Sequence, residues 1–363
     1  MTLREDLEAQ MMVPGLSGHE ERVAKAIRAR LDQIGLAHHT DRLGNVITTL
    51  EGNSNAPSVL LFTHMDQLGF ITRKITDDGF IKVERLGGVP ERALAAQPVL
   101  LCVGEGRDVP GIITNKAHHA TTPDEKYQVV RAPDLVIDAG FASKEDAIKA
   151  GVQIGTPIVY QPRVEAIGEH RVVGTSVDDR AGCAVQLAVA EALANRTGGP
   201  TVHLVFSVQE EFNLRGAVVA AQNLKPDIAI QIDLMLATDT PDMADRGEMT
   251  LGGGPGISLY SFHGRGTLNG VIPHPAMVQL MEETAASNAI SLQRSAQVGV
   301  LTDLSYVQLL GEGVASIDVG FPMRYSHSAN EMCDLRDLDA LANLLTNAIA
   351  AIGPNFPLSR EIA

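Results

Sequence analysis

The sequence predicts an α/β fold: a three-layer α/β/α domain with a mainly parallel sheet, interrupted by an inserted β-barrel-like module. Strand-like and helix-like segments alternate before about residue 70 and after about residue 164, as in sheets whose parallel strands are joined by helices. Between these points, short strand-like pieces separated by Gly, Pro and Asp turns replace the alternation. The predicted division is therefore residues 1–70 and 164–363 for the α/β domain, and residues 71–163 for the module.

The first part of the α/β domain is predicted to contain one helix and two strands. Residues 17–20, Ser-Gly-His-Glu, have the spacing of a capping box and predict the start of a helix. Apolar residues at every third or fourth position from Val23 to Ile34 form its buried stripe, and Gly35 ends it. Strands are expected at 44–50 and 58–63. The second is almost continuously apolar, as expected for a strand buried on both faces of a sheet.

The remaining predicted elements follow the same two sequence patterns: short strands separated by turns in the module, and alternating helices and strands in the α/β domain. In the module, we expect strands at 70–75, 80–85, 98–103, 111–114 and 157–160, with a helix-like stretch at 143–150. In the second part of the α/β domain, we expect helices at 179–194, 214–222, 275–288 and 337–352, and strands at 202–208, 228–233 and 313–319.

The composition excludes several classes of protein. The 363 residues include 45% hydrophobic and 20% charged residues, which is typical of a globular chain. The net charge of −15, from 29 basic and 44 acidic residues, argues against a nucleic-acid partner, because such binding depends on Lys and Arg at phosphates. No apolar run approaches the roughly 20 residues that span a bilayer. We therefore expect no membrane partner.

The cysteines and the N-terminal segment indicate a cytoplasmic protein. Cys102, Cys183 and Cys333 are the three cysteines, and none belongs to a C-x-x-C pair. This spacing predicts neither a disulfide framework nor a thiolate zinc site and is typical of a reducing compartment. Residues 1–12 are polar where a signal peptide would need an apolar run.

Five groups of polar residues stand where predicted strands end or a helix begins. They are His64-Met65-Asp66, Asp178-Asp179, Glu210-Glu211, Asp233 and His327. Ligands gather at the carboxyl ends of parallel strands in open α/β sheets. Histidine and carboxylate side chains together suit zinc, cobalt or manganese. Two such ions, about 3.5–4 Å apart, need a shared carboxylate and further ligands on each side.

Each group taken alone also has a structural interpretation. His-x-Asp is more often a surface or capping feature than a ligand pair. An Asp-Asp pair before a helix usually caps it and complements its dipole. Two adjacent glutamates after a buried strand are harder to explain without cations, because the pair suffers repulsion and desolvation. The coincidence of all five groups at the ends of core elements favours a metal site.

Six segments of the chain resemble the tetrahedral (TET) aminopeptidases. This family of dinuclear metallopeptidases includes deblocking and glutamyl aminopeptidases, and endoglucanase-like and fructose-operon members. The resemblance runs in the family's order over nearly the whole chain, and Gln-Glu-Glu followed by Leu-Arg-Gly is its most specific part. The matching segments are residues 14–20 (PGLSGHE), 63–70 (THMDQLGF), 177–182 (VDDRAG), 208–217 (VQEEFNLRGA), 237–241 (ATDTP) and 325–328 (YSHS).

The resemblance implies a role for each matched residue. Asp178 would bridge both metal ions, with His64 and Asp233 completing one site and Glu211 and His327 the other. Glu210 would be the general base for a water activated by the ions. Asp66 would orient the His64 ring without binding metal itself, because ligand histidines usually require such a partner. The wider clan also implies a cis peptide bond between Asp178 and Asp179.

The implied function is hydrolysis of N-terminal residues from peptides by a metallo-aminopeptidase with two divalent ions, zinc or cobalt, with manganese as an alternative. The module would mediate dimerisation, and dimers would assemble into a tetrahedral dodecamer. Two alternatives stay open: a metal-dependent deacylase, carboxypeptidase or glycan hydrolase, and a non-catalytic scaffold. Glycoside hydrolysis normally uses two carboxylates without metal, whereas scaffolds tend to lose ligands that are all present here.

Several residues depart from the family pattern or have no assigned role. The segment 301–305 (Leu-Thr-Asp-Leu-Ser) stands where relatives commonly have Gly-Thr-Asp-Ala, and Leu236 stands where many have a polar or aromatic residue. Residues 252–256 resemble the Gly-rich strand beside the substrate, or form an ordinary loop. Cys183 is interpreted as a small apolar helix residue rather than a nucleophile. His118 and His119 are expected in a loop near a subunit contact, and the roles of His263 and His274 are open.

Overall fold

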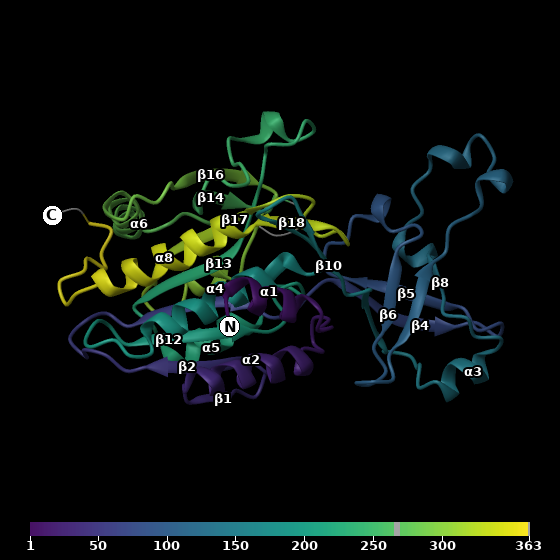
Figure 1. The fold of residues 1–363 in the computed structure, drawn as a ribbon, viewed down its shortest axis with the longest axis horizontal. Coiled ribbons are helices and arrows are strands. Elements are labelled where there is room, and N and C mark those ends of the chain that lie inside the picture. Colours follow the sequence, from purple (N-terminus) through teal and green to yellow (C-terminus); the bar gives the residue numbers. More distant parts are fainter. Residues whose placement is uncertain (265–268, 362–363) are drawn as a thin grey trace.

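The computed structural model describes residues 1–264 and 269–361. Figure 1 shows an elongated molecule with two parts: an α/β layered body and a separate group of strands that extends from it. In the part of the chain that is described, no helix is long and apolar enough to cross a membrane.

The body is built on a nine-stranded mixed sheet. Its order is β1-β2-β12-β3-β13-β17-β14-β15, and β16 pairs with β14. The four central strands, β12, β3, β13 and β17, are parallel to one another, whereas the β2–β12 and β14–β17 pairs are antiparallel. The strands are β1 (His38–Thr40), β2 (Val46–Leu50), β3 (Val59–His64), β12 (Val202–Ser207), β13 (Ile228–Leu236), β14 (Gly256–Phe262), β15 (Gly270–Val271), β16 (Gln293–Val298) and β17 (Ala315–Met323).

Helices cover both faces of this sheet, as predicted. Every residue of β3 is buried; Val59 and Leu61 pack into the cluster formed with α1, α4, α6 and α8, and Leu60 and Phe62 into the cluster formed with α5 and α7. Helix α2 packs on the same face as α4. The helices are α1 (Leu3–Met11), α2 (Glu21–Ile34), α4 (Val177–Leu193), α5 (Gly216–Leu224), α6 (Pro275–Ser287), α7 (Leu304–Val307) and α8 (Leu335–Ala351).

The second part of the molecule is a closed six-stranded barrel with strand order β4-β5-β8-β7-β6-β9. Figure 1 places it to one side of the body. Its strands are β4 (Gly69–Ile75), β5 (Ile81–Leu86), β6 (Pro98–Leu101), β7 (Val109–Ile113), β8 (Val136–Asp138) and β9 (Pro157–Tyr160), with helix α3 (Lys144–Lys149). A bidentate ion pair joins Arg22 of α2 to Asp108, next to β7. The barrel confirms the predicted module; the domain boundaries at 70 and 163 stay a prediction.

The body also contains a small three-stranded sheet. It has the order β10-β11-β18, with β10 (Val164–Ile167), β11 (Arg171–Gly174) and β18 (Glu331–Asp334). Strand β18 follows His327 in sequence, and β11 precedes helix α4. The pairing of β11 with β18 therefore brings the start of α4 next to the His327 segment.

The predicted capping box at residues 17–20 is wrong. Helix α2 begins at Glu21, and its N-cap residue Glu20 makes no side-chain cap. Instead, one Glu20 carboxylate oxygen accepts hydrogen bonds from the N–H groups of Gly18 and Gln209. A capping box does occur at Thr2 and Glu5, at the start of helix α1, which the sequence analysis did not predict. The end of α2 at the left-handed Gly35 is confirmed.

Candidate metal centre

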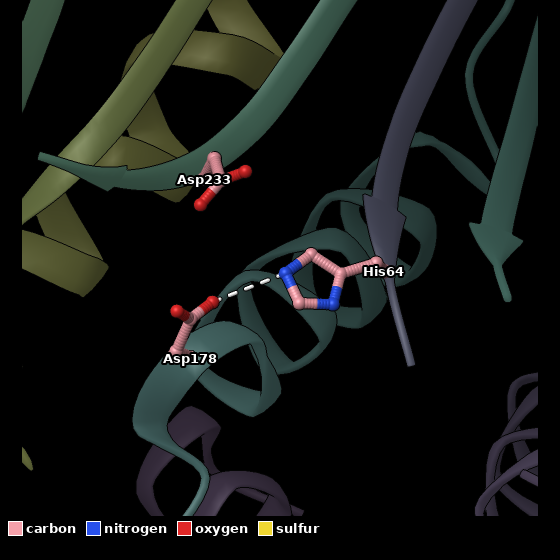
Figure 2. Close-up of side chains that lie close together, drawn as sticks. All are labelled: His64, Asp178 and Asp233. Carbon is pink, nitrogen blue, oxygen red and sulfur yellow. Dashed lines mark hydrogen bonds and ion pairs between the residues drawn. The ribbon is translucent and has the colours of Figure 1, made fainter. Parts of the chain in front are cut away.

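Three predicted ligands meet at the carboxyl edge of the central strands. His64 is the last residue of β3, Asp233 lies in the adjacent parallel strand β13, and Asp178 lies at the start of α4. One ligand atom from each side chain lies within 4.8 Å of the other two. Figure 2 shows the three side chains pointing toward one another, with a dashed line between His64 and Asp178. His64 Nε2 lies 3.0 Å from an Asp178 carboxylate oxygen. We call His64, Asp178 and Asp233 the strand triad.

A second set of three ligands shares Asp178 with the first. One ligand atom each from Asp178, Glu211 and His327 again lies within 4.8 Å of the other two. His327 Nε2 is 3.4 Å from an Asp178 oxygen and 3.8 Å from Glu211 Oε1. We call Asp178, Glu211 and His327 the loop triad. The two triads together contain all five predicted ligands.

The backbone at Asp178 departs from helical geometry at the start of α4. Ser176 has a left-handed conformation, and Asp178 and Asp179 have non-helical backbone angles. The peptide bond between Asp178 and Asp179 is cis, as the family resemblance implied. The Asp179 side chain turns inward instead, where it accepts hydrogen bonds from the Thr63 hydroxyl and the Gly182 N–H.

The Asp66 carboxylate holds the backbone that carries both glutamates. Its two oxygens accept hydrogen bonds from the N–H groups of Glu210 and Glu211, each at 3.0 Å. His64 Nδ1 lies 3.1 Å from the Asp66 carbonyl oxygen and 3.4 Å from a carboxylate oxygen. Asp66 thus contacts the ring nitrogen of His64 that faces away from Asp178, and it also fixes the loop after β12.

Glu331, which was not among the predicted site residues, holds the other side of the site in the same way. Its two carboxylate oxygens accept hydrogen bonds from the N–H groups of Asp178, at 3.0 Å, and His327, at 2.8 Å. Glu331 is 2% exposed. The Asp178 N–H is 153 positions away and the His327 N–H is four positions away, so no periodic pattern in the sequence points to Glu331.

The barrel contributes to the loop triad through its Gly87-Gly88 loop. His327 Nδ1 lies 3.0 Å from the Gly88 carbonyl oxygen, and a carbonyl can only accept, so Nδ1 carries the proton and Nε2 is left free to bind a metal. A methyl group on Gly88 would lie 3.0 Å from Nδ1, and one on Gly87 would lie 3.4 Å from Glu211. This contact between the barrel and the ligand was not predicted from the sequence.

The electrostatics of the site favour bound cations. Burial raises the pKa of Glu211 to about 7, and it raises the pKa values of Glu210 and Asp233 well above their usual range. Burial lowers the pKa of His64, but hydrogen bonds to Asp178 and Asp66 outweigh it and raise that pKa. Glu211 Oε1 is buried without a hydrogen-bond partner. Divalent ions fit this donor set because they would compensate the clustered carboxylates.

The site opens into a cleft of about 920 Å³. The ligands and Glu210 line it together with residues from the barrel loop, from the end of β13 and from the segments after β16 and β17, among them Gly88, Pro90, Leu234, Leu236, Val300, Thr302, Arg324 and Tyr325. Glu210 belongs to neither triad. It is therefore available for a role in chemistry rather than in ligation.

The other polar residues singled out in the sequence lie apart from the triads or face inward. His118 and His119 form an exposed turn in the barrel, so their expected place in a module loop is confirmed, and the subunit contact stays a prediction. His274 caps helix α6. The Cys183 thiol donates to the His64 carbonyl, and burial raises its pKa to about 12, which does not suit a nucleophile. His263 lines the cleft.

Comparison with known proteins decides the family. The model of the M42 glutamyl aminopeptidase family matches residues 44–344. The chain belongs to the M42 glutamyl aminopeptidase family. As an M42 member it is an aminopeptidase, in a family of peptidases that need divalent metal ions.

Proteins similar to this M42 chain match it over almost its full length. SgcX of Escherichia coli (strain K12) is 36% identical over 99% of this chain and 96% of its own length. The structure of aminopeptidase APDkam598 from the archaeon Desulfurococcus kamchatkensis has a TM-score of 0.90 and 31% identity, covering 98% of this chain and 96% of that one. Pyrococcus horikoshii TET1 peptidase, which can assemble into a tetrahedron or a large octahedral shell, has a TM-score of 0.85 and 28% identity, covering 96% and 99%.

Proposed function

We propose that this chain is a dinuclear aminopeptidase that removes N-terminal residues from peptides with Glu210 as its general base. The observation that carries the proposal is the pair of triads that share the Asp178 carboxylate. A bridging carboxylate flanked on each side by one histidine and one further carboxylate matches the needs of two neighbouring ions. We propose zinc or cobalt as the native pair, with manganese as the third candidate.

Two ions bound there would lower the pKa of a water molecule and polarise the scissile carbonyl group. Glu210 would take a proton from the attacking water and deliver it to the nitrogen of the leaving amine. Its position supports this role: Glu210 lines the cleft beside the triads without belonging to either. The hydrogen bond from its N–H to Asp66 keeps its backbone fixed next to His64.

An exopeptidase also needs a binding site for the free amino terminus of its substrate. In the proposed reaction, an ion or a neighbouring carboxylate such as Glu211 would hold that amine and so place the first peptide bond at Glu210.

The proposed oligomeric assembly follows a similar protein: the Pyrococcus horikoshii TET1 peptidase can assemble into a tetrahedron, and we propose dimers through the barrel and a tetrahedral dodecamer for this chain. The cytoplasmic location stays a prediction.

A substrate screen with controlled metal content tests the proposed function. The purified chain is treated with a chelator, reloaded with zinc, cobalt or manganese, and assayed with a panel of aminoacyl-p-nitroanilides and short peptides. We expect chelation to abolish hydrolysis and at least one of the three metals to restore it. Activity on glycans that resists chelation would favour the alternative of a glycan hydrolase instead.

Two further readouts separate the remaining alternatives. Release of residues from the C-terminus, or cleavage of N-acylated amino acids in preference to free amino termini, would favour a carboxypeptidase or a deacylase. If the metal-loaded chain cleaves no substrate of the panel, the scaffold alternative replaces the proposed function.

A further inference from the structure

The loop after β12, which carries Glu210 and Glu211, is held in place by side chains. Strand β12 ends at Ser207, and the backbone N–H groups of the next four residues, 208–211, each donate to a side-chain oxygen at 3.0 or 3.1 Å. The acceptors, in the order of these four donors, are Asn45, Glu20 and both carboxylate oxygens of Asp66. All of these acceptors lie far from the loop in sequence, so its conformation depends on contacts that it does not itself provide.

Gln209 is the residue at which this loop turns. Its backbone has a left-handed conformation, with φ of 58°, which residues other than glycine adopt only when their surroundings hold them there. Its carbonyl oxygen accepts a hydrogen bond of 3.2 Å from the Arg215 N–H, which closes the loop at its base. The conformation of Gln209 therefore sets the direction in which the next residue, Glu210, leaves the strand.

Glu20 contacts Gln209 from the N-terminal end of helix α2. Its Oε1 atom accepts hydrogen bonds from the Gln209 N–H, at 3.1 Å, and from the Gly18 N–H, at 2.6 Å. Glu20 is only 6% exposed, so water cannot easily replace it as the acceptor. An N–H group that loses its acceptor in such a place carries a desolvation penalty. Loss of the Glu20 carboxylate would therefore favour a different conformation of Gln209.

The segment that carries Glu20 is itself fixed to the turn that carries Asp66. The Gly15 N–H donates to the Gln67 side chain, and the Gln67 N–H donates to the Gly15 carbonyl oxygen, each at 3.0 Å. The Ser17 N–H donates to the Gln67 carbonyl oxygen at 3.2 Å. Residues 14–20 form one of the segments that resemble the family, and neither triad uses them. Support of the loop after β12 gives this segment a role.

Glu20 and Asp66 differ in what else they hold. Asp66 contacts both Glu211 and His64, so its removal would disturb metal ligands directly. The hydrogen-bond partners of the Glu20 carboxylate belong to neither triad. A change at Glu20 should therefore reach Glu210 and leave the contacts of the ligands in place.

The contact requires an acceptor and not a charge. Burial, together with the nearby Asp66 carboxylate, raises the pKa of Glu20 to about 7, so a large fraction of this side chain is uncharged near neutral pH. Both N–H groups share one oxygen, and the carbonyl oxygen of a neutral carboxyl group or of an amide can accept two hydrogen bonds. Glutamine should therefore serve in place of Glu20, whereas a side chain without an oxygen should not.

We propose that Glu20 is a positioning residue for the reaction: by binding the N–H of Gln209, it holds the turn that places the Glu210 carboxylate at the attacking water. Small displacements of a catalytic group lower turnover strongly, because the reacting atoms must lie within a narrow range of distances. The inference rests on the proposed aminopeptidase function and adds to it the residue that places the base.

Two variants of nearly equal size test the inference on an aminoacyl-p-nitroanilide that the wild-type chain cleaves. Glu20→Met removes the oxygen acceptor, and Glu20→Gln keeps it. We expect Glu20→Met to keep two ions per chain, with kcat at least about tenfold lower and KM little changed, as for a loss confined to the transition state. Glu20→Gln should keep the wild-type kcat. Asp6→Ala, which removes another buried carboxylate that contacts α2 through Arg30, is the control and should lower the melting temperature without a fall in kcat.

Hydrogen exchange gives a readout that does not depend on turnover. Peptides that cover residues 208–215 should exchange faster in Glu20→Met than in Glu20→Gln or Asp6→Ala, because the Gln209 N–H has lost its acceptor. If Glu20→Met does not fold, Glu20→Asp, whose side chain is one methylene group shorter, should show the lower kcat and the faster exchange instead.

Wild-type kcat or unchanged exchange in Glu20→Met would overturn the inference, and the same results in Glu20→Asp would do so where that variant replaces it. An equal fall of kcat in Glu20→Gln, or loss of an ion from Glu20→Met, would also overturn it. Failure of this inference is distinguishable from failure of the proposed function. Equally fast cleavage by the wild-type chain and Glu20→Met overturns only the role of Glu20, whereas no cleavage of any aminoacyl substrate by the wild-type chain contradicts the aminopeptidase itself.

Discussion

The strand triad and the loop triad share Asp178 but are held by different parts of the structure. His64 and Asp233 lie in adjacent parallel strands and are 1% and 8% exposed. Glu211 and His327 lie outside strands and helices, and the His327 side chain is 34% exposed. His327 also has a left-handed backbone conformation, with φ of 66°. The sheet therefore fixes one set of ligands, whereas the other set depends on contacts that its loops make.

Two of those contacts come from distant parts of the chain, and the third comes from Glu331, four residues after His327. Asp66 binds the backbone N–H of Glu211, Glu331 binds that of His327, and the barrel's Gly88 carbonyl contacts the His327 ring. We infer that an ion in the strand triad is bound by a largely preformed site. An ion in the loop triad is more sensitive to changes outside the ligands themselves.

The largest effect on metal content is expected from a substitution of Asp178, the residue that both triads share. Asp178→Ala removes a ligand from both triads and should reduce the metal content from two ions per chain toward none, with loss of hydrolysis. Elemental analysis after dialysis measures the metal, and a thermal melt confirms folding. Retention of two ions in this variant would show that Asp178 does not bridge them.

Removal of one ligand from each triad should separate the two sites. His327→Ala should lose the ion of the loop triad and keep the other, whereas Asp233→Ala should weaken the strand triad. Anomalous scattering from crystals of the His327→Ala variant locates the remaining ion, which we expect between His64, Asp178 and Asp233. An ion found instead beside Glu211 would reverse the comparison.

The pH dependence of the metal-free protein should show the cost of the clustered carboxylates. Burial raises the pKa of Glu211 to about 7 and that of Asp233 well above its usual value, so the folded chain binds more protons than the unfolded chain above about pH 4.5. The stability of the metal-free protein therefore falls as the pH rises through 7. The raised pKa values of His64 and His327 act in the same direction, because the stabilisation of each histidine cation is lost as it deprotonates.

Thermal melts with chelator and with zinc, at about pH 6 and pH 8, measure this effect. With chelator, we expect a lower melting temperature at pH 8 than at pH 6. Zinc should raise the melting temperature more at pH 8, because the ligands bind metal in their deprotonated forms. A metal-free protein that is more stable at pH 8 would argue against the assigned carboxylate cluster.

The smallest effect on metal binding is expected from a substitution at Gly88 in the barrel loop. In Gly88→Ala, the added methyl group would lie 3.0 Å from His327 Nδ1 and should displace the ring by a few tenths of an ångström. We expect affinity for the second ion to fall about tenfold, the lower end for partners that orient a ligand. Gly353→Ala, where a methyl group meets nothing within 4 Å, is the control. Equal metal titration curves for the two variants would limit the barrel to other roles.

The ligand types and their meeting point could be predicted from the sequence, because parallel strands bring their carboxyl ends to one edge of a sheet. The buried run before His64 and the strand before Asp233 carried that information. The family resemblance then assigned the individual roles and the cis bond at Asp178.

Of the supporting residues, Asp66 was implied by the family resemblance, whereas the contacts of Glu331 and Gly88 could not be predicted. Glu331 acts on the Asp178 backbone 153 positions away and Gly88 on the His327 ring 239 positions away, and no periodic pattern marks such contacts. Glu20 was assigned to a local cap, yet its carboxylate binds the N–H of Gln209 across 189 positions. Strands β14 and β16 were also not predicted; residues 252–256 were interpreted either as a Gly-rich strand beside the substrate or as an ordinary loop.

The central claim, two metal ions with Glu210 as the base beside them, is tested most directly by Glu210→Gln. Metal content and turnover are measured on the same preparation of this variant. We predict that it keeps two ions per chain, because Glu210 belongs to neither triad, while kcat falls at least about 100-fold, the lower range for loss of a general base. Near-normal turnover with both ions bound would contradict the assignment, and loss of an ion would make Glu210 a ligand.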